Sequence, residues 1–213
     1  MTTRAMPVLI LPGLGNSGPA HWQSHWERQD PGCTRVHQDE WDAPRCAAWC
    51  ARLDEVLGRQ PAPVVLAAHS SACALVAHWV AAASAVQLGR VHGALLVAPS
   101  DPEGLHYPAG PVGFGPVPLI RFPCASIVVA SSDDPYITLD RAQRYASAWG
   151  SRFVALPNAG HINAASGFGA WPEGYALLNT LRPAAAGAAC PATREHAATP
   201  ATIARRTSAR FGH

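Results

Sequence analysis

The sequence contains no apolar stretch of the roughly 20 residues that a helix needs to cross a bilayer. A short apolar segment follows Arg4 near the N-terminus, but Pro12 and Gly13 soon interrupt it. The segment therefore does not predict a secretory signal peptide. We expect a cytoplasmic protein that does not associate with membranes.

Charged residues are scarce, at 14% of the chain, and the formal net charge is only +2. No run of basic residues is interleaved with aromatic residues, so no nucleic-acid partner is indicated. The basic residues near the C-terminus, Arg205, Arg206 and Arg210, are few and scattered, which is typical of a solvated tail.

The six cysteines form no Cys-x-x-Cys pair and have no histidine at metal-ligand spacing. They are Cys33, Cys46, Cys50, Cys73, Cys124 and Cys190. We expect buried apolar thiols, and the sequence implies neither a metal nor an organic cofactor.

Short apolar runs alternate with segments of helical periodicity over most of the 213 residues. The runs that predict strands cover residues 8–11, 34–36, 64–68, 94–98, 127–130 and 153–156. The periodic segments that predict helices cover residues 19–28, 44–57, 72–83, 139–149 and 171–181, with Pro19 in the first helical turn. This alternation predicts a mostly parallel sheet of about six strands with helices on both faces.

Two segments fall outside this alternation. Residues 99–120 are rich in proline and glycine, and we expect them to cross the face of the sheet irregularly and line a pocket. Residues 183–213 contain mainly Ala, Pro, Thr and Arg without periodicity. The sequence thus predicts one compact domain over residues 1–182 and a disordered tail over 183–213.

The loop from Gly13 to Gly18 has the spacing of a dinucleotide-binding loop, with Gly15 between them. However, Pro19 and the residues after it do not resemble the apolar helix start that accompanies such a loop. The G-x-x-x-x-G-K-[ST] pattern is also absent, so nucleotide binding is not favoured.

Three predicted strands are followed by a serine, a carboxylate and a histidine. Ser70 follows residues 64–68, Asp134 follows residues 127–130, and His161 follows residues 153–156. Ligands of parallel sheets bind beyond the carboxyl ends of the strands. The chain order Ser, Asp, His is that of α/β-hydrolases. We therefore predict an α/β-hydrolase-type three-layer sandwich, with these three residues as a catalytic triad.

Ser70 is the preferred nucleophile because the sharp strand-to-helix turn around such a serine, the nucleophile elbow, needs small residues two positions away on each side. Ser70 has Ala68 and Ala72 there, where glycine is usual. The rival, Ser71, has bulkier neighbours at the same positions. A serine that follows a strand can also serve only as a helix N-cap.

The acid has three candidates, of which Asp134 is preferred, since it precedes a proline where the chain leaves the strand. Asp101 also follows a strand and precedes a proline, which suits an ordinary turn or cap, and Asp133 is adjacent. His161 is the only histidine between Asp134 and the tail.

Acyl transfer also needs donors for the oxyanion that develops on the substrate. We expect the backbone N–H of Ser71 to be one, and the N–H of Leu14, in the loop after the first strand, to be the other.

These segments resemble the small α/β-hydrolases that include retinoblastoma-binding protein 9 and the bacterial YdeN-like serine hydrolases. The resemblance covers residues 7–181 and rests on residues 11–17, 21–27, 69–79, 98–101, 132–136 and 160–174. It implies a compact core without a large lid and a triad at Ser70, Asp134 and His161. The alanines at 68 and 72 depart from the glycines usual in the family.

We therefore expect a monomeric serine hydrolase that cleaves small carboxylic esters through an acyl-enzyme. Two alternatives use the same fold: a non-catalytic protein-binding module, and an amidase or aminopeptidase with the same triad.

Overall fold

The structure is a computed structural model that describes residues 6–182, so the expected tail lies outside the described residues. The strands are β1 (Val8–Leu11), β2 (Cys33–Arg35), β3 (Val64–His69), β4 (Val91–Val97), β5 (Ala125–Ser131) and β6 (Arg152–Leu156). The helices are α1 (Trp22–Gln29), α2 (Cys46–Gly58), α3 (Ser71–Ala82), α4 (Ala85–Leu88), α5 (Leu139–Trp149) and α6 (Pro172–Thr180).

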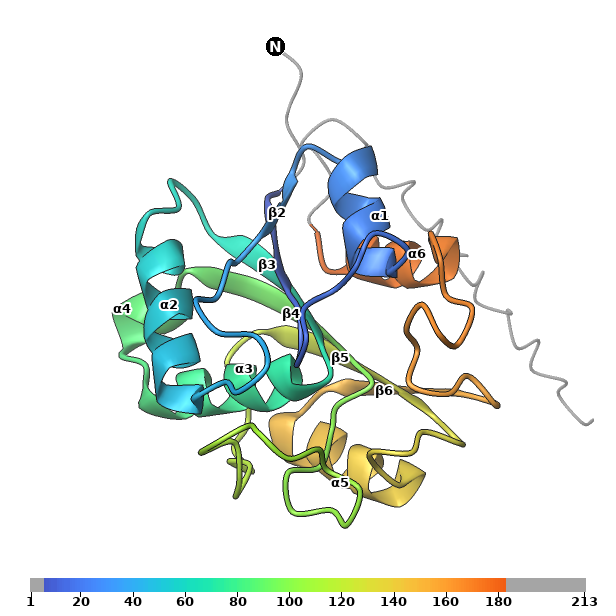
Figure 1. The fold of residues 1–213 in the computed structure, drawn as a ribbon. Coiled ribbons are helices and arrows are strands. Elements are labelled where there is room, and N and C mark those ends of the chain that lie inside the picture. Colours follow the sequence, from blue (N-terminus) through green and yellow to red (C-terminus); the bar gives the residue numbers. More distant parts are fainter. Residues whose placement is uncertain (1–5, 183–213) are drawn as a thin grey trace, which may run out of the picture.

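All strands pair in parallel in one sheet of order β2-β1-β3-β4-β5-β6 (Figure 1). This confirms the predicted three-layer α/β arrangement. The register pairs Leu11 with Ala68 and His69 with Val97. The carboxyl ends of β1, β3 and β4 therefore meet at one edge of the sheet, where the polar residues that follow them can converge.

Each face of the sheet is buried under its own group of helices. One face carries Leu66 and Leu96 and packs against α2, α3 and α5. The other carries Val65 and Leu95 and packs against α1 and α6. Successive residues of a strand point to opposite faces, so a strand with a helix layer on both sides is apolar throughout. This is why the core strands appear in the sequence as continuous apolar runs.

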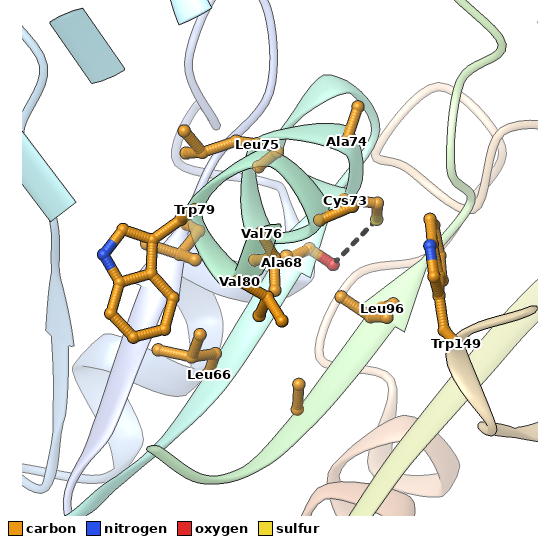
Figure 2. Packing of buried hydrophobic residues seen from close by; sticks show 14 of the residues in the cluster. Leu66, Ala68, Cys73, Ala74, Leu75, Val76, Trp79, Val80, Leu96 and Trp149 are labelled. Atoms are coloured by element: carbon orange, nitrogen blue, oxygen red, sulfur yellow. Dashed lines mark hydrogen bonds between the residues drawn. The ribbon is translucent and has the colours of Figure 1, made fainter. Parts of the chain in front are cut away.

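Helix α3, which follows Ser70, is buried along most of its length. Figure 2 shows Val80 of this helix beside Leu66 of β3. At its first turn, the Cys73 thiol donates to the carbonyls of Ala68, at 3.8 Å, and Val97, at 3.5 Å. Helix α3 is thus fixed on β3 and β4 close to the point where the chain turns.

Several boundaries differ from the sequence prediction. Helix α1 begins at Trp22, not at Pro19, because the His21 side chain accepts from the N–H of Gln23 and caps the helix. The short helix α4 was not predicted, since four residues are too few to show a helical period. As predicted, residues 99–120 contain no helix or strand. No helix within residues 6–182 has the length and hydropathy to cross a membrane.

The core packing predicts very different costs for two equivalent substitutions. Leu66 is fully buried, whereas Leu105 is fully exposed. Leu66→Ala should lower the free energy of unfolding by about 2–5 kcal/mol, because it removes buried methyl groups and leaves a cavity. Leu105→Ala should change it by less than about 0.5 kcal/mol. Urea unfolding measures both, and equal losses would contradict this view of the core.

Candidate active site

The turn between β3 and α3 is built on an unusual backbone conformation. Ser70 has φ 58° and ψ −127°, a left-handed conformation that costs a non-glycine residue about 1–3 kcal/mol. Its N–H donates to the carbonyl of Val97 at 3.0 Å. Because β3 and α3 are both buried, the turn between them is over-determined, and the Ser70 side chain is held at the carboxyl edge of the sheet.

A separate loop, which contains Gly13, passes close to Ser70. Ala68 and Ala72 are fully buried beside the turn, so alanine is accommodated at both positions. At Gly13, however, an added Cβ would lie 2.7 Å from the Ser70 Cβ and 3.2 Å from its Oγ. Around Ser70, the position that requires glycine is therefore Gly13. The sequence places Gly13 in the loop after the first strand but does not predict its contact with Ser70.

The structure brings Ser70, His161 and Asp134 together in one hydrogen-bonded chain. Ser70 Oγ lies 2.9 Å from His161 Nε2. His161 Nδ1 lies 2.9 Å and 3.0 Å from the two carboxylate oxygens of Asp134. A carboxylate can only accept, so Nδ1 carries the ring proton and Nε2 is free to accept from the Ser70 hydroxyl. All three residues are at most 9% exposed.

The other candidate acids have different partners. Asp101 accepts from Tyr145 Oη at 2.8 Å and pairs with Arg141 at 3.0 Å. Asp133 accepts from Ser131 Oγ at 2.6 Å and from the Gly160 N–H at 2.8 Å. These hydrogen bonds, the one from Ser131 above all, lower the pKa of the Asp133 carboxyl.

The rival nucleophile, Ser71, is also engaged elsewhere. Its side chain is buried, and its Oγ accepts from the Tyr107 hydroxyl at 3.3 Å. The geometry thus favours Ser70 over Ser71, and Asp134 over Asp101 and Asp133.

A second serine lies against the Ser70 hydroxyl. Ser100 Oγ is 2.9 Å from Ser70 Oγ, and Ser100 is buried. With the Ser70 proton directed at His161, Ser100 is the donor in this pair. Sequence reasoning did not single out Ser100, because its only signal is a place two residues after the strand-end alanine, Ala98.

Hydrogen bonds hold the loop that carries His161 on both sides of that residue. His69 Nε2 lies 3.0 Å from the carbonyl oxygen of His161, and Trp22 Nε1 donates to that of Ile162 at 2.9 Å. The N–H of Gly160 is held by Asp133, as described above. Residues from β3, α1 and the loop after β5 therefore set the position of the His161 ring.

His69 lies beside His161 and His21 lies beside His69, and both His69 and His21 are neutral near pH 7. Burial, with smaller effects of the charges of Arg35 and His161, lowers the pKa of His21 to about 4. Burial likewise holds the pKa of His69 well below its usual value. The ring of His69 lies 4.7 Å from that of His21 and 4.9 Å from that of His161.

The loop after β1 passes close to Ser70. The N–H of Gly15 donates to the Trp41 carbonyl, and that of Asn16 to the Gly13 carbonyl. The N–H of Leu14, which precedes them, has no protein acceptor within residues 6–182. Ser71 is the first residue of α3, where N–H groups lack intrahelical partners.

A cavity of about 220 Å³ opens beside Ser70. A larger one, of about 560 Å³, shares Tyr136 with it but does not contact Ser70. The smaller cavity is lined by Leu14, Asn16, His21, His69, Ser70, Ser100, Pro108, Tyr136, His161 and Asn163. Ser100 and Pro108 belong to the irregular segment that was expected to line a pocket.

No group of three or more His, Cys, Asp or Glu side chains that could hold a metal occurs in the described part of the chain. The five described cysteines are free thiols, and Cys190 lies outside the described residues.

Comparison with known proteins supports the resemblance seen in the sequence. A family model described as serine hydrolase matches residues 8–180. A YdeN-like hydrolase from Pectobacterium atrosepticum is 32% identical, with a TM-score of 0.72 over 84% of this chain and 93% of that one. No curated protein matches the chain significantly.

Two more distant structures share the fold. The ydeN gene product of Bacillus subtilis is 17% identical, with a TM-score of 0.60 over 83% of this chain and 98% of that one. An esterase from Thermogutta terrifontis is 15% identical, with a TM-score of 0.58 over 83% of this chain and 89% of that one.

The lowered pKa of His21 predicts a loss of stability in acid. The unfolded chain binds a proton at this ring near pH 6.5, whereas the folded chain binds it only near pH 4. The stabilisation is therefore complete above pH 6.5 and is lost as the pH falls toward 4. From pH 7 to 4.5, His21 should account for a loss of roughly 2 to 3 kcal/mol in the free energy of unfolding.

Urea unfolding of the wild type and of His21→Phe at both pH values measures this loss. The variant should lose less stability on acidification, because it has no ring to protonate at this position. Identical pH dependence in the two proteins would show that His21 does not titrate as its burial requires.

Proposed function

The chain belongs to the serine hydrolase family, and we propose that it hydrolyses small carboxylic esters with Ser70, His161 and Asp134 as its catalytic triad. The observation that carries the proposal is the continuous chain of hydrogen bonds from the Ser70 hydroxyl through His161 to Asp134. Such a chain is the arrangement that turns a weakly nucleophilic hydroxyl into an attacking group.

The reaction follows from the protons that these atoms hold. As Ser70 Oγ attacks the ester carbonyl carbon, His161 Nε2 takes the hydroxyl proton. The tetrahedral intermediate collapses, the C–O bond to the alcohol breaks, and His161 returns the proton to the leaving oxygen. A water molecule then repeats the attack on the acyl-enzyme, with His161 again as base, and releases the acid and free Ser70. Asp134 holds the Nδ1 proton throughout and stabilises the charged ring.

The oxyanion of each intermediate would be bound by two backbone donors, the N–H groups of Leu14 and Ser71. The Leu14 N–H has no other protein acceptor among the described residues, and the Ser71 N–H lies at the positive end of the α3 dipole. Each such donor contributes roughly 3 kcal/mol to lowering the barrier.

The cavity favours a small, uncharged ester over the alternatives. None of its lining side chains is an Asp or Glu that could pair with the free amino terminus of a peptide, which argues against an aminopeptidase. The intact hydrogen-bonded chain argues against a protein that only binds partners. Comparison of kcat/KM for short esters and the matching amides separates esterase from amidase activity. A cytoplasmic location and a monomeric state complete the proposal.

Covalent labelling tests the nucleophile. A fluorophosphonate should label the wild type and Ser71→Ala but not Ser70→Ala, because only Ser70 is activated by His161. Intact-protein mass spectrometry measures the single adduct. Equal labelling of the wild type and Ser70→Ala would remove Ser70 from the mechanism.

The close approach of Gly13 predicts a second effect on activity. Gly13→Ala should lower kcat/KM for a short ester about 100-fold or more, since the new methyl group would displace Ser70 or the oxyanion loop. Gly18→Ala is the matched control in the same loop, because its added Cβ would meet nothing within 4 Å. Steady-state kinetics of the two variants checks this, and a fully active Gly13→Ala would contradict the geometry.

A further inference from the structure

The cavity beside Ser70 is lined by two asparagines whose side-chain oxygens are occupied and whose amide N–H groups are not. We propose that this cavity selects esters that carry an uncharged oxygen acceptor, such as an ether or carbonyl oxygen, within a few atoms of the scissile bond. Asn16 and Asn163 would donate to that oxygen. The inference rests on the proposed ester hydrolysis at Ser70 and names the chemical class of its substrate.

Asn16 presents a donor because its oxygen is engaged by groups that can only donate. Its Oδ1 accepts from Arg35 Nη1 at 2.7 Å and from the N–H of Ser17 at 2.8 Å. A guanidinium and a backbone N–H have no acceptor, so the orientation of the amide is fixed. The Nδ2 group of Asn16 has no partner within the described residues, and Asn16 borders the cavity.

Asn163 is oriented in the same way. Its Oδ1 accepts from the N–H of Ser166 at 3.0 Å and from the Ser166 hydroxyl at 3.1 Å. The backbone N–H again decides the orientation, because it can only donate. The Nδ2 group of Asn163 is left without an acceptor in residues 6–182.

His21 also lines the cavity, but it adds neither a charge nor a free acceptor. Its Nδ1 accepts from the N–H of Gln23 at 3.2 Å, so this nitrogen carries no proton. The ring proton is then on Nε2, which is buried and has no hydrogen-bond partner among the described residues. This nitrogen exposes less than 1 Å² of surface, so an oxygen in the cavity does not reach it, and the donors that the cavity offers are the two asparagine amides.

The other lining side chains do not reverse this excess of donors. Ser100 is paired with Ser70, Ser70 is paired with His161, and His69 directs its Nε2–H to a carbonyl. The Nδ1 of His69 can accept, and the Tyr136 hydroxyl can do either.

The charge of the cavity decides between an uncharged oxygen and a carboxylate. Its lining contains no Lys or Arg, and His21 and His69 are neutral. Arg35 contacts Asn16 from behind, but its charge is paired with that of Glu27. The carboxylate of Asp134 lies behind His161 and would repel a second anion. Neutral donors without a cation therefore suit an ether or carbonyl oxygen better than a carboxylate.

Two pairs of esters that differ in one atom test this inference. Methoxyacetate and butyrate esters of one phenol place an oxygen or a methylene in the acyl chain. 2-Methoxyethyl acetate and butyl acetate do the same in the alcohol. The ratio of kcat/KM within each pair is measured for the wild type, Asn16→Asp and Asn163→Asp. Comparing ratios between proteins cancels the inherent reactivity of the substrates.

Each substitution keeps the oxygen that accepts from Arg35 or Ser166 and replaces the donor by an acceptor. The preference for the oxygen-containing ester should fall at least about threefold in each variant, in the acyl pair or the alcohol pair. Asn179→Asp is the matched control, since it makes the same change of charge at an exposed residue outside the cavity. It should keep the wild-type ratio.

The ester pair whose kcat/KM ratio changes in the variants shows whether the acyl or the alcohol part of the substrate occupies the cavity. Unchanged ratios in both pairs, with Ser70 still labelled and the esters still cleaved, would overturn this inference and leave the proposed function standing. Failure of the proposed function is distinct, because Ser70 would then not be labelled and none of the four esters would be cleaved.

Discussion

The backbone of Ser70 is held in a left-handed conformation, with φ of 58°, between a fully buried strand and a buried helix. A non-glycine residue adopts this conformation only where its surroundings leave no alternative. Here β3 and β4 fix the entry to the turn and α3 fixes the exit, so the free energy of core burial offsets the strain. The Ser70 hydroxyl thereby stands at the sheet edge, where the loops after β1, β4, β5 and β6 can reach it.

The sequence was most informative where the signal is local. The strand of residues 64–68 is a continuous apolar run, and its position before Ser70 suffices to place that serine at the sheet edge. The order of Ser70, Asp134 and His161 along the chain predicts that they share one edge of the sheet, because each follows its own parallel strand.

Contacts between distant segments could not be predicted in this way. Gly13 fits against Ser70 from another loop, and Ser100 meets it from the end of β4. Neither contact leaves a spacing or period in the chain. The start of α1 was misplaced for a related reason: His21 caps the helix, a role for which Ser, Thr, Asp and Asn are the expected residues.

Three imidazole rings lie in contact near Ser70, but only that of His161 faces a carboxylate. Burial keeps His21 and His69 neutral, so in the proposed mechanism the positive charge of proton transfer would be concentrated on His161. The neutral rings have structural tasks instead, because His21 caps α1 and His69 holds the carbonyl of His161. The same neutrality leaves a cavity that offers hydrogen-bond donors without charge.

The central claim is that Ser70 attacks its substrate while Leu14 and Ser71 bind the oxyanion. A crystal structure of the protein after reaction with a phosphonate ester tests both parts at once, since the phosphonyl group mimics the tetrahedral intermediate. The account predicts phosphorus bonded to Ser70 Oγ, with the phosphonyl oxygen within about 3 Å of the N–H groups of Leu14 and Ser71. An adduct on any other residue, or a phosphonyl oxygen turned away from both N–H groups, would contradict it.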